Sequence, residues 1–453
     1  MSNKLRSPWW WIPTLYFAEG IPYFIVNNIS VTMFKRLGMP NGDLAMYTSL
    51  LYLPWVIKPL WSPFVDVIRT KRWWIVLMQL LCTVGFAGLA LSVSPDVFGW
   101  SLVIFYIIAF ASATHDIAAD GYYMIALEQK QQATFVGIRS TFYRIASVFG
   151  QGVIVVLAGV LEERLGAIPR AWSITLLASA VLFALITLWH TRFLPKVETS
   201  PERLSPSGAV HPDRVGRAER RPIAEEGLQP SGETRRIFRE FAEAWITFFK
   251  KPGVWLAITF MLLYRLPEAF SVKMLTPFLL DPVEAGGLGL STAQSGLVYG
   301  TVGVIALTVG GILGGLYAAK QGLRKSMWPM SMALALPCAV YLILAAVQPT
   351  ALWSIFALVA LDQFGYGFGF TAYMLYMMQF SEGSFKTSHY AICTGLSYLG
   401  LLLPGMFSGW LKDAVGYRTF FIIVMACCVI TFVVTAFLKI DPEFGKKDAT
   451  ANQ

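Results

Sequence analysis

The sequence predicts an all-α membrane protein with about twelve transmembrane helices, arranged as two halves of six. The first reason is composition, because 56% of the 453 residues are hydrophobic and only 14% are charged, whereas soluble domains are about 25% charged. The second is that the apolar residues form long blocks, and a helix needs about 20 such residues to cross a bilayer. The third is that one long polar stretch, residues 195–252, separates six blocks from six more.

The apolar blocks follow one another with short polar connections, as expected for helices that run back and forth across a membrane. We expect an N-terminal half at 1–194 and a C-terminal half with a short tail at 253–453. The predicted spans are 9–34, 43–65, 72–94, 100–127, 133–161 and 171–194 in the first half, then 253–280, 292–319, 326–347, 351–380, 387–411 and 417–438 in the second.

The stretch between the halves has two parts. Residues 195–232 are rich in Pro, Ser, Gly and alternating charges, which is typical of a flexible linker. Residues 233–251 place aromatic side chains at helical spacing among Arg and Lys. This pattern predicts an amphipathic helix on a membrane surface; a solvated connector is the alternative.

The placement of Lys and Arg predicts the orientation. The connections on the same side as the N-terminus are rich in Lys and Arg, and cationic loops resist translocation. We therefore expect both termini and the linker in the cytoplasm. The net charge of +9 is spread over short loops and forms no basic face, so the sequence argues against nucleic acid as a partner. The five cysteines fall inside apolar blocks, which predicts buried side chains and no metal site.

Charged side chains inside the predicted spans are the strongest functional signal. A charge at the centre of a membrane helix costs a few kcal/mol, so these groups must face one another or a wet cavity. A chain that keeps so many is expected to have a polar pathway through its interior. The charged groups, with one histidine, are Glu19, Lys58, His115, Asp116, Asp120, Arg139, Arg144, Arg192, Arg265, Glu268, Lys273 and Asp362.

Two ion pairs are predicted between the fourth and fifth spans, which run in opposite directions. Asp120 and Arg139 lie at similar depths, and Asp116 and Arg144 form the next level. Such pairs either hold helices together or couple transport to protons, since an aspartate that takes up a proton releases its arginine. Arg265 and Glu268 are three residues apart on one helical face. They are expected to pair with each other or to bind oppositely charged groups of a ligand, and Glu268 is also a candidate for proton coupling.

A second group of residues is predicted to line a substrate cavity. Glu19 stands beside Gly20 and Pro22, which loosen the helix, so it either contacts substrate, carries a proton or pairs with Lys58. His115 either titrates or stays buried and neutral. The tyrosines either line a sugar-binding cavity or pack in the core. The other cavity candidates are Tyr16, Tyr23, Asn27, Arg265, Lys273, Asp362 and Tyr373.

Five segments, in order, carry a resemblance to a known family. They are KPLWSPFVD (58–66), SATHDIAAD (112–120), IRSTFYRIAS (138–147), YRLPEAF (264–270) and SFKTSHYAICTGLSYLG (384–400). Together they resemble the AmpG-type muropeptide permeases of the major facilitator superfamily, over most of residues 12–412. Acetyl-CoA transporters and some siderophore permeases are relatives.

The resemblance implies a major facilitator fold and proton-driven import of anhydromuropeptides across a bacterial inner membrane. A siderophore or acyl-CoA-type substrate is the alternative. Asp116 and Asp120 match the family pattern in the fourth span. The segment with Asp66, Arg69 and Arg72, beyond Lys58, looks like a form of the superfamily's inner-gate motif.

Three positions depart from the family pattern. His115 stands where Gln is frequent, Glu268 replaces a more usual Asp, and Glu19 stands where a small residue is common. An extra acid disfavours a purely anionic ligand unless Arg265 or Lys273 offsets it.

Other classes of protein fit less well. A membrane-embedded enzyme would need a His-Asp pair, and neighbours such as His115 and Asp116 point to different helix faces. A channel does not explain the six-plus-six repeat. We therefore expect a monomeric transporter of a small molecule, with protons and membrane lipid as further partners, no cofactor and no catalytic activity.

Overall fold

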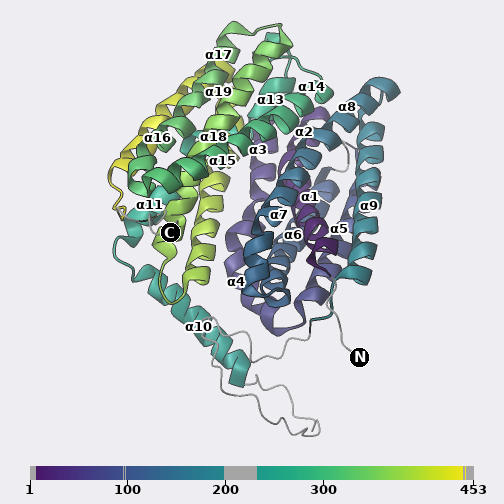
Figure 1. The fold of residues 1–453 in the computed structure, drawn as a ribbon. Coiled ribbons are helices and arrows are strands. Elements are labelled where there is room, and N and C mark those ends of the chain that lie inside the picture. The colour runs from purple at the N-terminus through teal and green to yellow at the C-terminus, as the bar shows by residue number, and fades with distance from the viewer. Residues whose placement is uncertain (1–6, 95, 97, 198–231, 442–443, 445–453) are drawn as a thin grey trace.

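The computed structural model describes residues 7–94, 96, 98–197, 232–441 and 444, and within these residues every regular element is a helix. Figure 1 shows the two halves as separate bundles side by side, the first in purple to blue and the second in green to yellow. The helix α10 lies across one end of the molecule. The predicted all-α membrane fold is therefore confirmed, whereas the predicted flexible linker falls largely on 198–231, outside the described residues.

The N-terminal half contains six helical passages, two of which are interrupted by π-helical turns. The first passage is α1, η2 and α2, and the fifth is α7, η4 and α8. The elements are α1 (Ile12–Phe24), η2 (Ile25–Ile29), α2 (Ser30–Arg36), α3 (Asn41–Leu50), α4 (Leu53–Val67), α5 (Lys71–Leu91), α6 (Phe98–Ala126), α7 (Gln129–Val148), η4 (Phe149–Val153), α8 (Ile154–Leu165) and α9 (Ile168–Phe193).

The C-terminal half follows α10 (Gly232–Phe249), which stands where the sequence predicts the amphipathic helix. The first passage of the C-terminal half is broken twice, between α11 and α12 and between α12 and α13. The elements are α11 (Val254–Leu263), α12 (Leu266–Ser271), α13 (Leu275–Leu280), α14 (Thr292–Ser295), η7 (Gly296–Gly303), α15 (Val304–Gln321), α16 (Leu323–Ala335), η8 (Leu336–Cys338), α17 (Ala339–Val347), α18 (Leu352–Ser381) and α19 (Lys386–Ala436).

In the described part of the chain, nine helices are long and apolar enough to cross a membrane. One of them, the 51-residue α19, changes direction at Gly416, where φ is 74°. That angle lies in the left-handed region that glycine adopts readily, so α19 corresponds to two passages. The interrupted passages 12–36 and 41–67 are not among the nine. The helices thus agree with the predicted arrangement, and the total of twelve spans remains a prediction.

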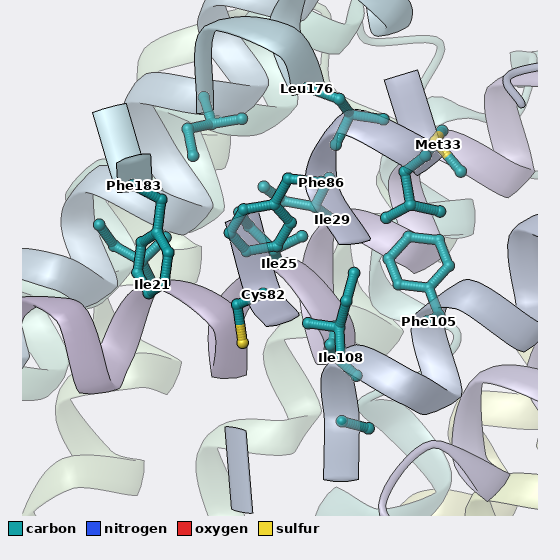
Figure 2. Close-up of a cluster of buried hydrophobic side chains, with 14 of the residues drawn as sticks. Ile21, Ile25, Ile29, Met33, Cys82, Phe86, Phe105, Ile108, Leu176 and Phe183 are labelled. Carbon is teal, nitrogen blue, oxygen red and sulfur yellow. The ribbon is translucent and has the colours of Figure 1, made fainter. Parts of the chain in front are cut away.

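The core of the N-terminal half fixes the orientation of its first passage. Figure 2 shows Ile21, Ile25, Ile29 and Met33 against side chains of α5, α6 and α9, namely Cys82, Phe86, Phe105, Ile108, Leu176 and Phe183. Residues four apart share one helical face, so these four form an apolar stripe. Packing of this stripe leaves another face of the same passage, with Tyr16, Glu19, Tyr23 and Asn27, for the polar groups described next.

Candidate functional site

Three carboxylates from two helices form a cluster in the N-terminal half. One oxygen from each of Glu19, Asp116 and Asp120 lies within 4.8 Å of the others. Asp116 and Asp120 share a face of α6 because they are four residues apart. Glu19 comes from α1, which touches α7 closely beside it, since a Cβ on Gly20 would lie 2.7 Å from Cβ of Ala146. We call these three residues the carboxylate cluster.

Two cations pair with the cluster. Lys58 of α4 forms an ion pair with Asp116, and Arg139 Nη2 of α7 lies 2.7 Å from Asp120 Oδ1. Tyr16 donates a hydrogen bond to Asp120 (3.3 Å), and its ring lies 4.6 Å from the guanidinium carbon of Arg139. The cluster therefore contains three acidic side chains and two cationic ones, so one carboxylate has no cation of its own to neutralise it.

Glu19 is the carboxylate of the cluster that forms no ion pair with a described residue. Its side chain is 7% exposed, and its Oε2 has no hydrogen-bond partner in the described structure. By contrast, the side chains of Asp120 and Arg139 are 40% and 32% exposed. An unpaired buried carboxylate is costly in the charged form. The cluster can therefore hold a proton at a place that water reaches.

One predicted ion pair is not formed. Arg144 was expected to pair with Asp116, but its Nη1 lies 3.5 Å from Thr308 Oγ1 in the other half, and Lys58 takes Asp116 instead. The predicted depth along the antiparallel helices identifies the correct partner of Arg139, namely Asp120. The partner of Asp116 depends instead on the direction in which each side chain leaves its helix, and depth alone does not specify that direction. Lys58, predicted as a gate residue, belongs to this cluster.

His115 turns away from the carboxylate cluster, which corrects its prediction as a cavity residue. Its Nε2 lies 2.9 Å from Nε2 of Gln79, whose Oε1 lies 2.9 Å from Nδ1 of His190. Nε2 of His190 lies 2.9 Å from Oγ1 of Thr14. We call these four residues the buried histidine chain. The chain links α1, α5, α6 and α9 inside the N-terminal half. His115 and Asp116 are consecutive on α6 and therefore point to different sides of the helix, which separates His115 from the carboxylate cluster.

The C-terminal half presents a second charged pair at the break between α11 and α12. Arg265 binds Glu268 through two bonds, Nε to Oε2 at 2.8 Å and Nη2 to Oε1 at 2.6 Å. The guanidinium also donates to Tyr366 (2.8 Å) and Ser397 (3.2 Å). Pro267 is the second residue of α12, and Arg265 directly precedes this helix and lies in the break. The predicted alternative in which these two residues pair with each other is the one the structure shows.

Aromatic rings lie close together where the two halves meet. Tyr23 is 5.1 Å from Trp55 and 6.5 Å from Tyr398 of the C-terminal half, between ring centroids.

Tyr373 and Asp362, which are predicted to line the substrate cavity, make their hydrogen bonds elsewhere. The hydroxyl of Tyr373 donates to the Met261 carbonyl (2.6 Å), and Asp362 accepts from Tyr341 (2.8 Å). Both are bound within the C-terminal half and do not belong to this boundary.

The two halves are tied together at the end remote from α10, which we call the closed end. Nζ of Lys35 lies 2.5 Å from Asp281 Oδ1 of the other half, and Tyr417 donates to Asp281 at 2.7 Å. Asn41 donates to Asp413 across the same boundary at 3.1 Å. A second contact between the halves is the hydrogen bond that Thr292 of the C-terminal half donates to Glu162 (2.6 Å). Arg36 of the N-terminal half pairs with the same carboxylate (3.0 Å).

None of these contacts at the closed end was predicted from the sequence. The partners of Lys35 and Arg36 lie more than a hundred residues away in the chain, and no periodic pattern joins them. The available signal was that charged residues stand at the ends of spans on the side where Lys and Arg are scarce.

Glycines bring the main chains of the two halves into contact. A Cβ on Gly300 would lie 1.9 Å from the carbonyl oxygen of Gln151, and a Cβ on Gly409 would lie 1.9 Å from that of Asn41. No L-residue with a side chain fits such a gap without displacing the backbone. The halves are therefore closed on each other by backbone packing as well as by ion pairs.

Of the predicted inner-gate residues, Arg69 and Arg72 make their described contacts within the N-terminal half. Arg72 donates to carbonyl oxygens near the end of α9, Thr191 at 2.6 Å and Leu194 at 3.2 Å. This is a favourable place for a cation, because the last carbonyls of a helix lack partners. Arg69 lies 6.0 Å from the ring of Trp73. The side chain of Asp66 lies outside the described residues.

The membrane-length helices, the broken passages and the polar boundary between the two halves define a multi-pass secondary transporter. The sequence matches the profile of the Major Facilitator Superfamily over residues 14–388 and 269–453. The chain belongs to this superfamily.

Relatives within the superfamily agree with the predicted resemblance. The anhydromuropeptide permease of Escherichia coli K12 is 24% identical over 92% of this chain and 76% of its own length. An uncharacterized protein of Haemophilus influenzae is 24% identical over 89% of this chain and 88% of its own. A putative transporter AmpG 3 of Rickettsia typhi is 21% identical over 84% of each chain.

Solved structures share the fold. An inward-facing, unoccupied bacterial homologue of the lysosomal transporter Spinster superposes with a TM-score of 0.66 at 16% identity, covering 94% of each chain. The nucleoside transporter NupG gives 0.64 at 15% identity, over 97% of this chain and 100% of its own. The predicted major facilitator fold is therefore confirmed.

Proposed function

We propose that this protein imports anhydromuropeptides, the sugar-peptide fragments of the cell wall, together with protons across a bacterial inner membrane. The similarity to the Escherichia coli anhydromuropeptide permease over 92% of the chain supports the substrate. The orientation predicted from Lys and Arg supports cytoplasmic termini. The protein would act as a monomer and release its substrate chemically unchanged.

The observation that carries the proposal is the surplus acid of the carboxylate cluster. Glu19, Asp116 and Asp120 face two cations, Lys58 and Arg139. In a buried setting the third acid is stable when it takes up a proton. A proton bound there neutralises the cluster, and its loss restores a charge that favours another arrangement of the helices.

The centre of the boundary suits a substrate that is both sugar and peptide. Tyr23, Trp55 and Tyr398 offer aromatic faces with polar edges. Arg265 and Glu268, already paired with each other, offer charges of both signs to a ligand that carries carboxylates and amines. These residues lie in both halves, so a ligand between them would contact both.

The closed end makes this conformation inward-facing under the proposed orientation. Lys35 and Asp281 close the periplasmic end, whereas Asp120 and Arg139 are open to water nearer the linker. Import then requires the ion pairs at the closed end to break and re-form in each cycle. A change of this kind, in which one bundle moves against the other about a central site, is the general mode of such transporters.

The helix α10 is proposed to lie on the cytoplasmic surface of the membrane. Phe248 is buried against Phe380 of the C-terminal half (5.6 Å between ring centroids), which anchors one side of the helix. Ile246 and Phe249 remain exposed, beside Lys250. An apolar strip next to cationic residues fits the headgroup region of a lipid bilayer.

Uptake of labelled anhydromuropeptide into proteoliposomes tests the function. We expect accumulation above equilibrium when the outside is more acidic, and only equilibration without a proton gradient. Protein that elutes as a single folded species and takes up no label would refute the substrate. Uptake that ignores the gradient would refute the coupling and leave the substrate standing.

A further inference from the structure

Lys273 is a fully buried cation without an acidic partner. Its exposed fraction is 0%, and no carboxylate of the described residues lies within ion-pair distance of its ammonium group. It stands in the break between α12 and α13, where the chain turns at 272–274. A buried ammonium without a counter-charge costs several kcal/mol, so its position calls for an explanation.

Among the described residues, the three contacts that stabilise the Lys273 ammonium all come from the opposite half. Nζ donates to the carbonyl oxygens of Thr48 (3.0 Å) and Asn27 (3.4 Å). It also lies 4.4 Å from the centre of the Tyr52 ring, a favourable cation–π distance. Lys273 belongs to the C-terminal half, whereas these three residues belong to the N-terminal half. Separation of the halves at this level would therefore remove all three contacts at once.

Two further polar atoms near Lys273 lack partners. Oγ of Ser49 and Oδ1 of Asn27 are buried and make no hydrogen bond in the described structure. Ser49 lies next to Lys273, because a Cβ on Gly405 would be 2.7 Å from Ser49 Oγ and 3.6 Å from Lys273 Cγ. When the halves separate, an ammonium group and a free hydroxyl donor would face the same space. These are the donors that a carboxylate accepts most readily.

We propose that Lys273, with Ser49, binds a carboxylate of the substrate when the closed end opens. On closure, the carbonyl oxygens of Thr48 and Asn27 and the ring of Tyr52 take the place of the carboxylate. The substrate then loses its strongest anchor and leaves toward the linker end. This inference rests on the proposed function, since it identifies the anionic group of the cell-wall peptide as the part that is recognised first.

The charges of the neighbouring residues favour this assignment. Arg265 is already neutralised by Glu268 through two hydrogen bonds. Lys58 and Arg139 are likewise paired with aspartates. Lys273 is held by two carbonyl oxygens and one aromatic ring, and these satisfy an ammonium less completely than a carboxylate does. An anionic ligand would thus gain more from Lys273 than from these paired cations.

The first test compares two substrates and three proteins. Uptake from outside is measured for anhydromuropeptide with free carboxylates and for the same compound with its carboxylates amidated. The wild type should prefer the free acid in kcat/KM by at least about tenfold, which corresponds to about 1.4 kcal/mol. Lys273→Gln should lose the preference through a higher KM for the free acid, and Lys273→Arg should keep it. A Lys273→Gln protein that still prefers the free acid overturns the proposal.

The second test does not depend on the substrate. Ser49→Cys is treated from outside with a membrane-impermeant anionic thiosulfonate and with its cationic counterpart, and the peptide that carries residue 49 is quantified by mass spectrometry. We expect the anionic reagent to react faster by about tenfold, and the ratio to approach one when Lys273→Gln is added. Equal rates with Lys273 present, or no reaction at all, overturn the anion site. If the anionic preference holds while muropeptide uptake fails, the proposed substrate is wrong and the anion site stands.

Discussion

Lys35 and Asp281 form a 2.5 Å ion pair that joins the two halves of the protein at the closed end. Tyr417 donates a hydrogen bond of 2.7 Å to Asp281 Oδ2, and Nζ of Lys412 lies 3.7 Å from the same oxygen. The pair therefore belongs to a small network and is not an isolated surface contact. Its energy is part of the free-energy difference between the two conformations of the transporter.

Asp281→Asn should shift the population toward the conformation that is open at this end. The substitution removes the carboxylate that pairs with Lys35, while Lys412 keeps Asp413 at 3.3 Å. The expected cost to the closed form is about 1–3 kcal/mol. Labelling of Ser49→Cys from outside should accelerate accordingly. Glu284→Gln, an exposed acid nearby, is the matched control and should leave the labelling rate unchanged. Equal labelling of both variants would contradict the assigned role of the pair.

Gly300→Val should prevent closure of the same end, since a Cβ there would lie 1.9 Å from the Gln151 carbonyl oxygen. The protein should fold, expose Ser49→Cys permanently and lose transport. Gly315→Val is the control further along the same helical passage, where no neighbouring atom lies within 4 Å of the added Cβ. Normal uptake by Gly300→Val would show that the backbone contact is dispensable.

Glu19→Gln should separate substrate movement from proton movement. Glutamine keeps the shape of the side chain but cannot exchange a proton, so accumulation driven by a pH gradient should disappear. Exchange of labelled for unlabelled substrate should continue, because it needs no net proton transfer. Glu163→Gln, an exposed acid on α8, should behave like the wild type. Gradient-driven accumulation by Glu19→Gln would exclude Glu19 as the proton site.

Asp120→Asn should abolish accumulation without unfolding the protein. The change removes the partner of Arg139 and converts the cluster to two acids and two bases, which leaves no acid that requires a proton. The expected loss of thermal stability is about 1 kcal/mol or less, since both side chains reach water. A variant that concentrates substrate normally would refute the assignment.

Gln79→Leu should lower thermal stability by about 1–3 kcal/mol, because it removes the hydrogen-bond partner of Nε2 of His115 and of Nδ1 of His190. The chain faces away from the carboxylate cluster, so the proton dependence of uptake should not change in the protein that remains folded. His115→Gln preserves a hydrogen-bonding group and should cost less. A shifted proton dependence in Gln79→Leu would connect the histidines to transport.

The sequence was sufficient for the features that depend on local spacing. Asp116 and Asp120 share a helical face, and Arg139 lies at the depth of Asp120 on the next span, so this contact could be predicted. The partner of Asp116 could not, because it depends on the direction of Lys58 on a third helix. The contacts of Lys35 and Asp281 depend on how one half rests on the other, and no periodicity of a single chain encodes that relation.

The ion pair at the closed end has a consequence for the effect of salt. The side chains of Lys35 and Asp281 are only 14% and 11% exposed, and ions in solution screen such sheltered charges much less than exposed ones. The balance between the two conformations should therefore change little between dilute and concentrated media. The rate of substrate uptake should accordingly depend little on the salt concentration of the medium.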